Sequence, residues 1–412
     1  MPDYFDTLET RSPAEREQAL LAALPAALAR AVKRAPALAR QLEGIDLASV
    51  TSREALAKIP VTRKHALVDL QPKQPPFGGF SAVDYGEDMP RVFASPGPIY
   101  EPQGTQRDYW RFGRALYAAG FRAGELAHNC FSYHFTPAGA MMETAAHAVG
   151  CTVFPGGIGQ TEQQVRAIAD LKPHGYVGTP SFLKIILEKA DELGVKLESI
   201  HKALVSGEAF PPSVRDWFAE RGVAGYQAYG TADVGLIAYE TEARDGLVLA
   251  EDIIVEIVRP GTNDPVPDGE VGEVVVTTFN PAYPLVRFGT GDLSAILAGP
   301  SPCGRTNARI KGWMGRADQT TKIRGMFVHP EQVAEIVKRH PEVIKARLVV
   351  TGKVSAEVVT LKLEVSGASA ELAERIMASA RELTKIRVEV VMGAAGSLVN
   401  DGKVIEDARS YE

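Results

Sequence analysis

The sequence is poor in cysteine and has no long apolar stretch, and these two shortages exclude several classes of protein. Its three cysteines, Cys130, Cys151 and Cys303, are an odd number at wide spacings, which argues against a disulfide-stapled extracellular domain. No run of about 18 apolar residues is present, so we expect no membrane span. The polar, acidic opening "MPDYFDTLETRSPAEREQ" does not resemble a signal or transit peptide. We therefore expect a cytoplasmic protein.

An excess of positive charge is also missing. The chain has 45 Lys and Arg residues against 51 Asp and Glu residues, a net charge of −6, without runs of like charge. This balance argues against nucleic acid as the main partner. With 45% hydrophobic and 23% charged residues, the 412-residue chain has a globular composition. Single cores stop growing near roughly 250–300 residues, so we expect at least two domains.

The first part of the chain, up to about residue 75, is predicted to be mostly helical. "SPAEREQALLAALPAALARAVKRAPALARQLE" repeats apolar residues at helical spacing, and Ser12 followed by Pro13 is typical of a helix start. After the next loop, the stretch from Thr105 to Ala119 predicts a helix that Gly120 ends. A short apolar strand is predicted from Leu126 to Phe131.

Helices and strands then alternate from "AGAMMETAAHAVG" to "PPSVRDWFAERG". This alternation predicts an α/β fold with a largely parallel sheet covered by helices, in a core spanning residues 76–250. Residues 251–317 predict a β region, because two apolar strands flank a long turn rich in Pro, Gly and Asp. Residues 318–412 predict a compact α+β domain of ferredoxin-like type, with a hinge near Asp318.

Two loops that follow predicted strands have residues suited to a nucleotide, at the sheet edge where α/β proteins bind ligands. In "VSGEAF" a Gly-Glu pair can lay backbone against a flat ring, although most such loops are plain turns. In "YQAYGTADVG" a purine could stack on Tyr229 while Asp233 holds Mg²⁺ on a phosphate oxygen. The alternative for this stretch is a local turn beside a buried tyrosine.

Two later stretches add a carboxylate and a cation. In "VRFGTGDL", Asp292 follows an expected Gly-Thr-Gly turn and is suited to accept both hydroxyls of a ribose. The alternative is a hairpin turn in which Asp292 bonds only local amides. In "GWMGRADQTTKIRG", Arg316 could reach phosphate or ribose, or it could be a solvated arginine.

The order of these stretches resembles the adenylate-forming, AMP-binding enzymes, specifically the phenylacetate–coenzyme A ligases. The resemblance covers nearly the whole chain and is carried by "FPGGIGQTEQQV", "LKPHGYVGTPSFL", "AYGTADVG", "VPDGEVGEVVVTTF", "PLVRFGTGDL", "GRADQTTKIRGMFVHPEQV" and "GSLVNDGKVIEDAR". It implies a large N-terminal domain, residues 1–317, and a small mobile C-terminal lid domain, residues 318–412. It also implies two half-reactions, in which ATP with Mg²⁺ and a carboxylic acid give an acyl-adenylate, and coenzyme A then displaces AMP.

The resemblance also implies roles for individual residues. Lys403 would be the catalytic lysine, which without the motif would count as an ordinary surface lysine, and Asp292 and Arg316 would contact ribose or phosphate. The remaining implied nucleotide residues are Gly207, Glu208, Ala209, Phe210, Tyr229, Gly230 and Thr231, with Ser95 and Gly97 in the phosphate loop and Asp233 on the metal. The implied hinge is Asp318, the coenzyme A side has Arg324 and Gly325, and the acid pocket has Tyr133, His134, Phe135 and Ala138.

The chain departs from the family pattern at the phosphate loop. "ASPGPIYEPQG" keeps Ser95 and Gly97 but lacks the tandem hydroxyls and the lysine, and its prolines remove amide donors. We expect Glu101 to place a negative charge near the β- and γ-phosphates, which at about 5 Å would oppose them by about 3 kcal/mol. Two cations are also lost before Asp292, and only Cys303 matches a Cys/His cluster of some relatives, so we predict no structural zinc.

Three functions are therefore weighed. The first is an ATP-dependent acyl- or aryl-coenzyme A ligase acting on a carboxylic acid, with aromatic acids favoured by the aromatic pocket residues. The second is a descendant that binds AMP or an acyl-adenylate with impaired use of ATP. The third is adenylyl transfer to an acceptor that is not a carboxylate. Family members are often homodimers, so a dimer is an open expectation.

Overall fold

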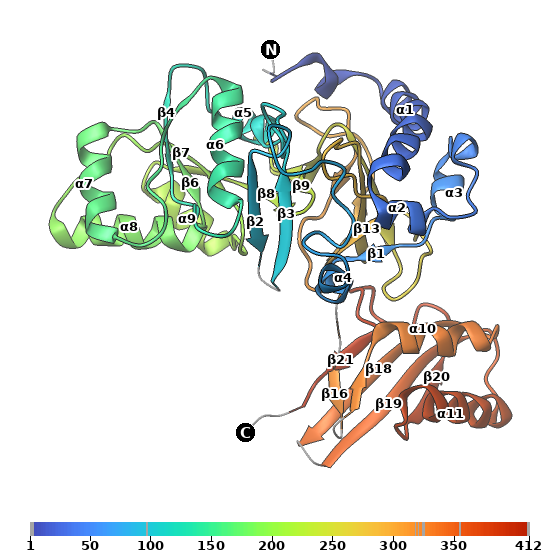
Figure 1. Cartoon of the computed structure of the whole chain (residues 1–412). Coiled ribbons are helices and arrows are strands. Elements are labelled where there is room, and N and C mark those ends of the chain that lie inside the picture. The colour runs from blue at the N-terminus through green and yellow to red at the C-terminus, as the bar shows by residue number, and fades with distance from the viewer. Residues whose placement is uncertain are drawn as a thin grey trace. The chain divides into compact units, whose positions relative to one another are not determined.

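The computed structural model describes residues 4–95, 98–317, 319, 321–323, 326–353 and 356–409 (Figure 1). The chain divides into two compact units. The larger unit comprises Met1–Val255, Val276–Thr290 and Leu297–Trp313, and the smaller comprises Glu256–Val275, Gly291–Ile296 and Met314–Glu412. Strands β11, β12 and β13 each begin in one unit and end in the other.

The larger unit begins with the expected helical region. Its elements are η1 (Thr7–Thr10), α1 (Pro13–Arg34), α2 (Pro36–Gln41), η2 (Leu47–Ser49), α3 (Arg53–Leu56), η3 (Lys64–Ala66) and α4 (Leu67–Lys73). Ser12 caps α1 in a reciprocal capping box with Glu15, as the sequence indicates. None of the helices in the described ranges combines the length and apolar character that a membrane crossing needs.

A nine-stranded sheet forms the centre of the larger unit, in the order β14-β15-β10-β9-β8-β7-β6-β4-β5. Strands β4 to β8 run parallel, whereas β8, β9, β10 and β15 pair antiparallel. The strands are β4 (Leu126–Asn129), β5 (Thr152–Phe154), β6 (Gly175–Gly178), β7 (Lys202–Val205), β8 (Ala224–Thr231), β9 (Gly235–Tyr239), β10 (Leu247–Leu249), β14 (Ile296–Leu297) and β15 (Arg309–Ile310). The predicted mixed α/β sheet is therefore confirmed.

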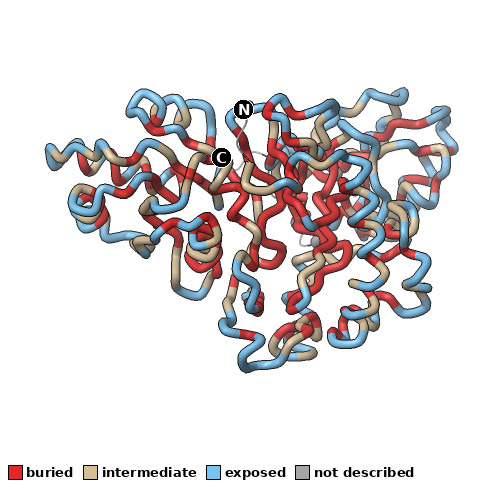
Figure 2. Tube along the Cα trace, turned by 90° about the horizontal axis from the view of Figure 1, so that it is seen from above, coloured by how far each residue is buried: buried red, intermediate tan, exposed pale blue. Residues whose placement is uncertain are grey.

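The helices between these strands bury one face against the sheet. They are α6 (Ala138–Val149), α7 (Thr161–Leu171), α8 (Pro180–Leu193) and α9 (Pro212–Glu220). Gly150 and Gly194 end α6 and α8 in the left-handed conformation that glycine adopts without strain. Ile186, Leu183 and Phe218 belong to one buried cluster with residues of the sheet. Figure 2 accordingly shows buried residues mainly on the inner segments of the chain and exposed residues mainly on its outer loops.

The helix predicted from Thr105 to Ala119 is much shorter in the structure. Only α5 (Gly113–Ala118) is helical, because Arg111 lies in the left-handed region with φ 66°. The Asp108 carboxylate accepts the Gly113 amide at 2.8 Å and thereby starts the helix at this later residue. The preceding phosphate-loop region is a hairpin of β2 (Arg91–Ser95) and β3 (Ile99–Gln103), in which Phe93 is opposite Glu101.

A second sheet has the order β1-β13-β12-β11. Its strands are β1 (Thr62–Arg63), β11 (Ile253–Val258), β12 (Gly272–Thr278) and β13 (Phe288–Ser294). The expectation of a Gly-Thr-Gly turn before Asp292 was wrong, because Gly289 to Asp292 lie inside β13. Every residue of β13 is buried, so packing on both faces outweighs the turn preference of two glycines.

The C-terminal part of the smaller unit is the expected compact α+β module. It comprises β16 (Thr321–Ile323), β17 (Met326–Val328), α10 (Pro330–Arg339), β18 (Val343–Lys353), β19 (Ala356–Val365), α11 (Ala370–Thr384), β20 (Glu389–Gly393) and β21 (Ile405–Asp407). Its sheet has the order β20-β19-β18-β21, with the central pair antiparallel and the outer pairs parallel. Helix α10 packs against β18 and α11, and α11 packs against β20 (Figure 1).

Candidate functional site

Asp233 lies in the short turn after β8 and is paired with a lysine from the helical start of the chain. The Lys64 ammonium donates to Asp233 Oδ2 at 2.5 Å, and the aspartate side chain is fully buried. Thr231 Oγ1 accepts the Val234 amide at 3.1 Å and so fixes the turn that holds Asp233. Lys64 could not be predicted from the sequence, because it lies 169 residues from Asp233 and belongs to no recognisable motif.

Glu101 interacts with Asp233 and differs from the negative charge that we expected at this position. It is 2% exposed and accepts the Ser95 hydroxyl at 2.5 Å. Burial and then the nearby Asp233 carboxylate raise the pKa of Glu101 to about 8, so Glu101 is mostly neutral at pH 7. This charge state differs from the negative charge that we expected at Glu101, and the effect of Glu101 on the phosphates stays a prediction. Ser95 is described, whereas Gly97 lies outside the described residues.

The residues expected around adenine divide into exposed backbone and a buried ring. Gly207, Glu208 and Ala209 are exposed after β7, and Glu208 Oε1 accepts the Ser181 amide at 2.6 Å. Phe210 instead packs inside the larger unit, with its ring centroid 5.6 Å from that of Phe218. The exposed part of this loop is thus available to a flat ligand, and the Phe210 ring is not.

Tyr229 is buried on β8, in the same strand as Gly230 and Thr231. Its hydroxyl lies 3.2 Å from Thr290 Oγ1 of β13. A side chain at Gly230 would place its Cβ 2.5 Å from the Gly235 carbonyl oxygen, so only glycine fits this turn. The strand end therefore combines a fixed aromatic ring with the tight turn that leads to Asp233.

The expected acid-pocket residues share a loop but differ in exposure. Tyr133 is half-buried, and its hydroxyl accepts the Asn129 side-chain amide at 2.8 Å. Burial and the Glu143 carboxylate raise the pKa of Tyr133. His134 and Phe135 are exposed, Phe135 at 82%, and Ala138 begins α6. Tyr133 is therefore partly buried, whereas His134 and Phe135 are exposed to solvent.

Asp292 and Arg316 form a pair in the smaller unit. Arg316 Nη1 donates to Asp292 Oδ1 at 2.7 Å, and a backbone bridge joins the two residues. Gly291 has φ 77°, and a Cβ built there would lie 2.7 Å from Arg316 Nη2. Glycine is thus needed here for both its conformation and the space it leaves for the guanidinium group.

The loop that carries Lys403 is held by a residue that the sequence did not indicate. Gln319 donates to the Gly402 carbonyl at 2.9 Å and accepts the Val404 and Ile405 amides at 2.5 and 2.8 Å. Lys403 itself is exposed. A Cβ on Gly402 would lie 3.1 Å from the side chain of Leu293, the neighbour of Asp292 in sequence. Three hydrogen bonds from one side chain thus fix the loop on both sides of Lys403.

Besides Gly97, three of the predicted residues cannot be placed. Asp318, Arg324 and Gly325 lie outside the described residues, so the hinge and the coenzyme A side stay predictions. Cys303 is buried, with Ser301 Oγ 3.1 Å from its sulfur. In the described part of the chain, we find no group of three or more His, Cys, Asp and Glu side chains that could hold a metal.

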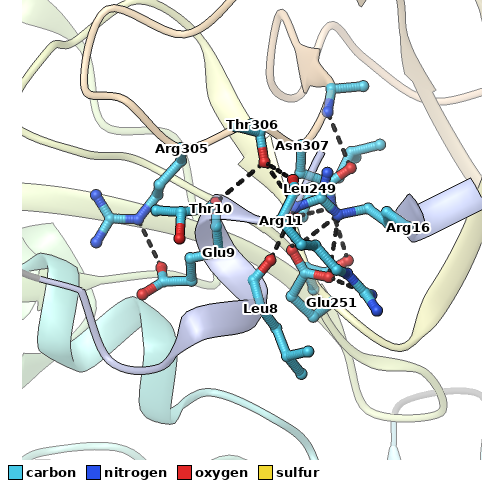
Figure 3. A network of polar contacts seen from close by, with 12 residues as sticks. Leu8, Glu9, Thr10, Arg11, Arg16, Leu249, Glu251, Arg305, Thr306 and Asn307 are labelled. Atoms are coloured by element: carbon cyan, nitrogen blue, oxygen red, sulfur yellow. Dashed lines mark hydrogen bonds and ion pairs between the residues drawn. The ribbon is translucent and has the colours of Figure 1, made fainter. Parts of the chain in front are cut away.

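The region around Cys303 is tied to the N-terminal segment by a buried polar network (Figure 3). Arg305 Nε donates to Glu9 Oε1 at 2.6 Å, and Arg16 Nε donates to Glu251 Oε1 at 3.0 Å. Thr306 contacts both Glu9 and Arg11 through backbone oxygens. The network fixes η1 and the start of α1 to the loop before β15.

Known proteins resemble this chain in sequence over most of its length. The model of the family described as AMP-binding enzyme matches residues 112–282. The phenylacetate–coenzyme A ligase of Thermus thermophilus is 34% identical over 382 residues, which cover 88% of this chain and 84% of that protein. The enzyme of the same name from Escherichia coli is 29% identical and covers 97% of this chain and 94% of that protein.

Solved structures agree with the sequence comparisons. A 2-hydroxyisobutyryl–coenzyme A ligase, in an open conformation with 2-HIB-AMP and coenzyme A, is 25% identical with a TM-score of 0.71. The match covers 95% of this chain and 90% of that one. The same ligase in its thioesterification state matches with a TM-score of 0.70, 25% identity and coverage of 98% and 91%. The chain therefore belongs to the family of AMP-binding enzymes, as an AMP-forming acid–thiol ligase similar to the phenylacetate–coenzyme A ligases.

Proposed function

We propose that the chain activates an aromatic carboxylic acid with ATP and transfers the acyl group to coenzyme A, with Lys403 as the catalytic lysine. The observation that carries the residue assignment is the Gln319 brace. It fixes the loop on both sides of Lys403 within the unit that also contains the Asp292–Arg316 pair. A catalytic cation requires this kind of fixed backbone, because an ammonium group stabilises developing charge only when it is held in place.

In the first half-reaction, a carboxylate oxygen of the acid attacks the α-phosphorus of ATP. The bond from that phosphorus to the oxygen bridging to the β-phosphate breaks, and pyrophosphate leaves. We assign to Asp292 the acceptance of the ribose hydroxyls and to Arg316 a contact to ribose or phosphate. The Lys403 ammonium would offset the charge that gathers between the attacking carboxylate and the α-phosphate.

The nucleotide base would lie along the exposed backbone of Gly207 to Ala209 and against Tyr229, Gly230 and Thr231. Asp233 fits a magnesium ligand, because Asp233 Oδ1 is buried and lacks a hydrogen-bond partner among the described residues. A bound Mg²⁺ would neutralise phosphate charge. Ser95 and Gly97 would border the phosphates. The support for these roles is the match to the family motifs, residue by residue.

In the second half-reaction, the coenzyme A sulfur attacks the acyl carbonyl carbon, and the bond to AMP breaks. We assign the hinge for the change between half-reactions to Asp318 and the coenzyme A side to Arg324 and Gly325. The related 2-hydroxyisobutyryl–coenzyme A ligase has been solved in both an open and a thioesterification state. That pair of states supports a moving C-terminal lid in the present chain.

An aromatic acid is the proposed substrate class. The named relatives act on phenylacetate, and the half-buried Tyr133 ring offers an apolar surface for an aryl group. His134 and Phe135 would close over the acid from the same loop, while Ala138 leaves room at the start of α6.

The test is a comparison of Lys403→Ala with the wild-type enzyme. We expect acid-dependent pyrophosphate release to fall about a hundredfold or more, because a cation at the reacting centre is lost. AMP affinity, measured by calorimetry, should stay within about twofold, since AMP lacks the reacting carboxylate. Lys362→Ala removes another exposed lysine of the smaller unit and serves as the matched control. Equal losses of pyrophosphate release and AMP affinity would contradict the role of Lys403.

A further inference from the structure

Several buried side-chain atoms of the larger unit lack a hydrogen-bond partner within the described ranges, and three of them belong to residues that interact with one another. They are Glu101 Oε2, Asp233 Oδ1 and the Tyr283 hydroxyl oxygen. The three residues are between 1% and 4% exposed. Each of these atoms forfeits its hydrogen bonds to water on burial. Three of them in one region point to a group that would contact them.

The three atoms belong to a single cluster. The carboxyl groups of Glu101 and Asp233 are within hydrogen-bonding reach of each other when Glu101 carries its proton, and the charges of both act on the Tyr283 hydroxyl. The three residues come from β3, from the turn after β8 and from the loop before β13. The chain thus converges on this spot from three separate segments.

The existing partners satisfy only one oxygen of each carboxyl group. Ser95 donates to Glu101 Oε1, and the Lys64 ammonium donates to Asp233 Oδ2, each at 2.5 Å. The second oxygens, Glu101 Oε2 and Asp233 Oδ1, therefore receive no hydrogen bond from Ser95 or Lys64. Two ionised carboxylates about 4 Å apart repel by about 4 kcal/mol at an effective dielectric of 20, and a cation between them removes that cost.

We propose that Glu101 is a second protein ligand, together with Asp233, for the divalent cation that accompanies ATP. The inference rests on the proposed function, in which Asp233 contacts the cation. It adds a residue from the altered phosphate loop itself. Glu101 Oε2 and Asp233 Oδ1 would be the donor atoms, and the Tyr283 hydroxyl would contact a metal-bound water.

The donor set suits Mg²⁺ or Mn²⁺ with a nucleotide. Mg²⁺ in nucleotide enzymes takes one or two carboxylates and completes its octahedron with phosphate oxygens and water. Two carboxylate oxygens alone are too few for a closed protein site. The cation is therefore expected to bind together with the phosphates rather than ahead of them.

This arrangement explains how a loop without a lysine serves a triphosphate. A loop lysine would contact the phosphates directly, whereas Glu101 would act on them through the shared cation. Binding of ATP should then depend on the divalent cation much more strongly than binding of AMP, which lacks the β- and γ-phosphates.

The experiment measures the affinity for a non-hydrolysable ATP analogue by calorimetry, in EDTA and again with saturating Mn²⁺. The ratio of the two dissociation constants is the affinity gain caused by the cation. We expect Glu101→Gln to reduce this gain about tenfold or more, as loss of a metal-site residue does. Its affinity in EDTA should stay within about twofold of wild type, because Gln preserves shape and removes only the ionisable group.

Asp108→Asn is the matched control, because Asp108 also has a buried carboxyl oxygen without a partner in the described structure but lies outside the cluster. The affinity gain that the cation causes in Asp108→Asn should equal the gain in wild type. If Glu101→Gln keeps the wild-type gain while Asp233→Asn loses it, the inference is overturned and the role of Asp233 stands. If Mn²⁺ does not raise the affinity of the wild-type enzyme for the analogue, both the inference on Glu101 and the proposed role of Asp233 fail. If Glu101→Gln changes the affinity equally in both buffers, Glu101 acts on the phosphates without the cation, and the inference is again overturned.

Discussion

At the scale of single residues, burial decides what the carboxylates of this enzyme can do. Glu101 was expected to face the phosphates because of its place in the loop, yet its position on β3 turns the side chain inward. A buried carboxyl group with one hydroxyl donor favours the neutral form, which is why the pKa of Glu101 rises to about 8. A buried ionisable residue that lowers the stability of the folded chain in this way is a candidate for a functional role.

That cost can be measured in the metal-free enzyme. Because the pKa of Glu101 is raised to about 8, the unfolded chain loses the Glu101 proton near its ordinary pKa of 4.5 while the folded chain keeps it. Stability is therefore lost as pH rises from about 4.5 to 8. Glu101→Gln should raise the free energy of unfolding by a few kcal/mol at pH 7.5, with no such gain near pH 4. Urea unfolding in EDTA at both pH values checks this, and a variant less stable than wild type at pH 7.5 would contradict the assigned charge state.

Gly291 permits a second prediction at this scale. Gly291→Ala places a Cβ within 2.7 Å of Arg316 Nη2 and puts a side chain on a residue with φ 77°. We expect displacement of Arg316 to weaken AMP binding about tenfold, the loss of roughly one charged hydrogen bond. Gly315→Ala is the control, because Gly315 also has a positive φ, 126°, but has no atom within 4 Å of the built Cβ. Similar AMP affinities for the two variants would mean that strain alone is responsible.

At the scale of elements, the N-terminal segment depends on buried charges. Arg305 and Glu9, which pair in Figure 3, are 5% and 1% exposed as side chains, and the Tyr239 hydroxyl also donates to Glu9. Arg305→Met leaves the Glu9 carboxylate buried beside an apolar side chain. The contacts that join η1 to the loop before β15 are then weakened at their centre.

We expect Arg305→Met to lower the free energy of unfolding by about 3–5 kcal/mol, as breaking a buried ion pair does. Arg339→Met provides the comparison, because Arg339 pairs with Glu335 and Glu382 at the surface. Its cost should be under about 1 kcal/mol. Chemical denaturation of both variants tests the difference, and equal costs would show that the network in Figure 3 contributes no more than a surface pair.

The elements also show what the sequence could and could not predict. The start of a helix with clear apolar spacing and a capping residue, α1 at Ser12 and Pro13, was predicted to the residue. The non-helical stretch from Thr105 to Arg111 was not predicted. The left-handed conformation of Arg111 and the hydrogen bond from the Gly113 amide to Asp108 are features of tertiary structure. Asp233 and Arg316 could be proposed as site residues because they lie in motifs beside strands. Lys64 and Gln319 could not, since each acts through contacts with residues far away in the chain.

At the scale of the whole molecule, the chain passes repeatedly between its two units through β11, β12 and β13. The proposed lid movement needs a separate hinge, for which Asp318 is the candidate. Asp318→Pro would fix φ near −65° and restrict the preceding residue. We expect it to slow the thioester-forming half-reaction at least about tenfold more than adenylation, because only one lid position is needed for the first step. Rapid-quench measurement of each half-reaction checks this, and equal slowing of both would place the hinge elsewhere.

The central claim is that this chain makes a coenzyme A thioester through an acyl-adenylate. The most direct measurement incubates the enzyme with ATP, Mg²⁺ and phenylacetate, with and without coenzyme A, and identifies the products by mass spectrometry. We predict phenylacetyl-adenylate and pyrophosphate without coenzyme A, and phenylacetyl–coenzyme A with AMP when coenzyme A is added. If a panel of aromatic acids leaves ATP intact, or yields ADP and phosphate in place of AMP and pyrophosphate, the account is contradicted.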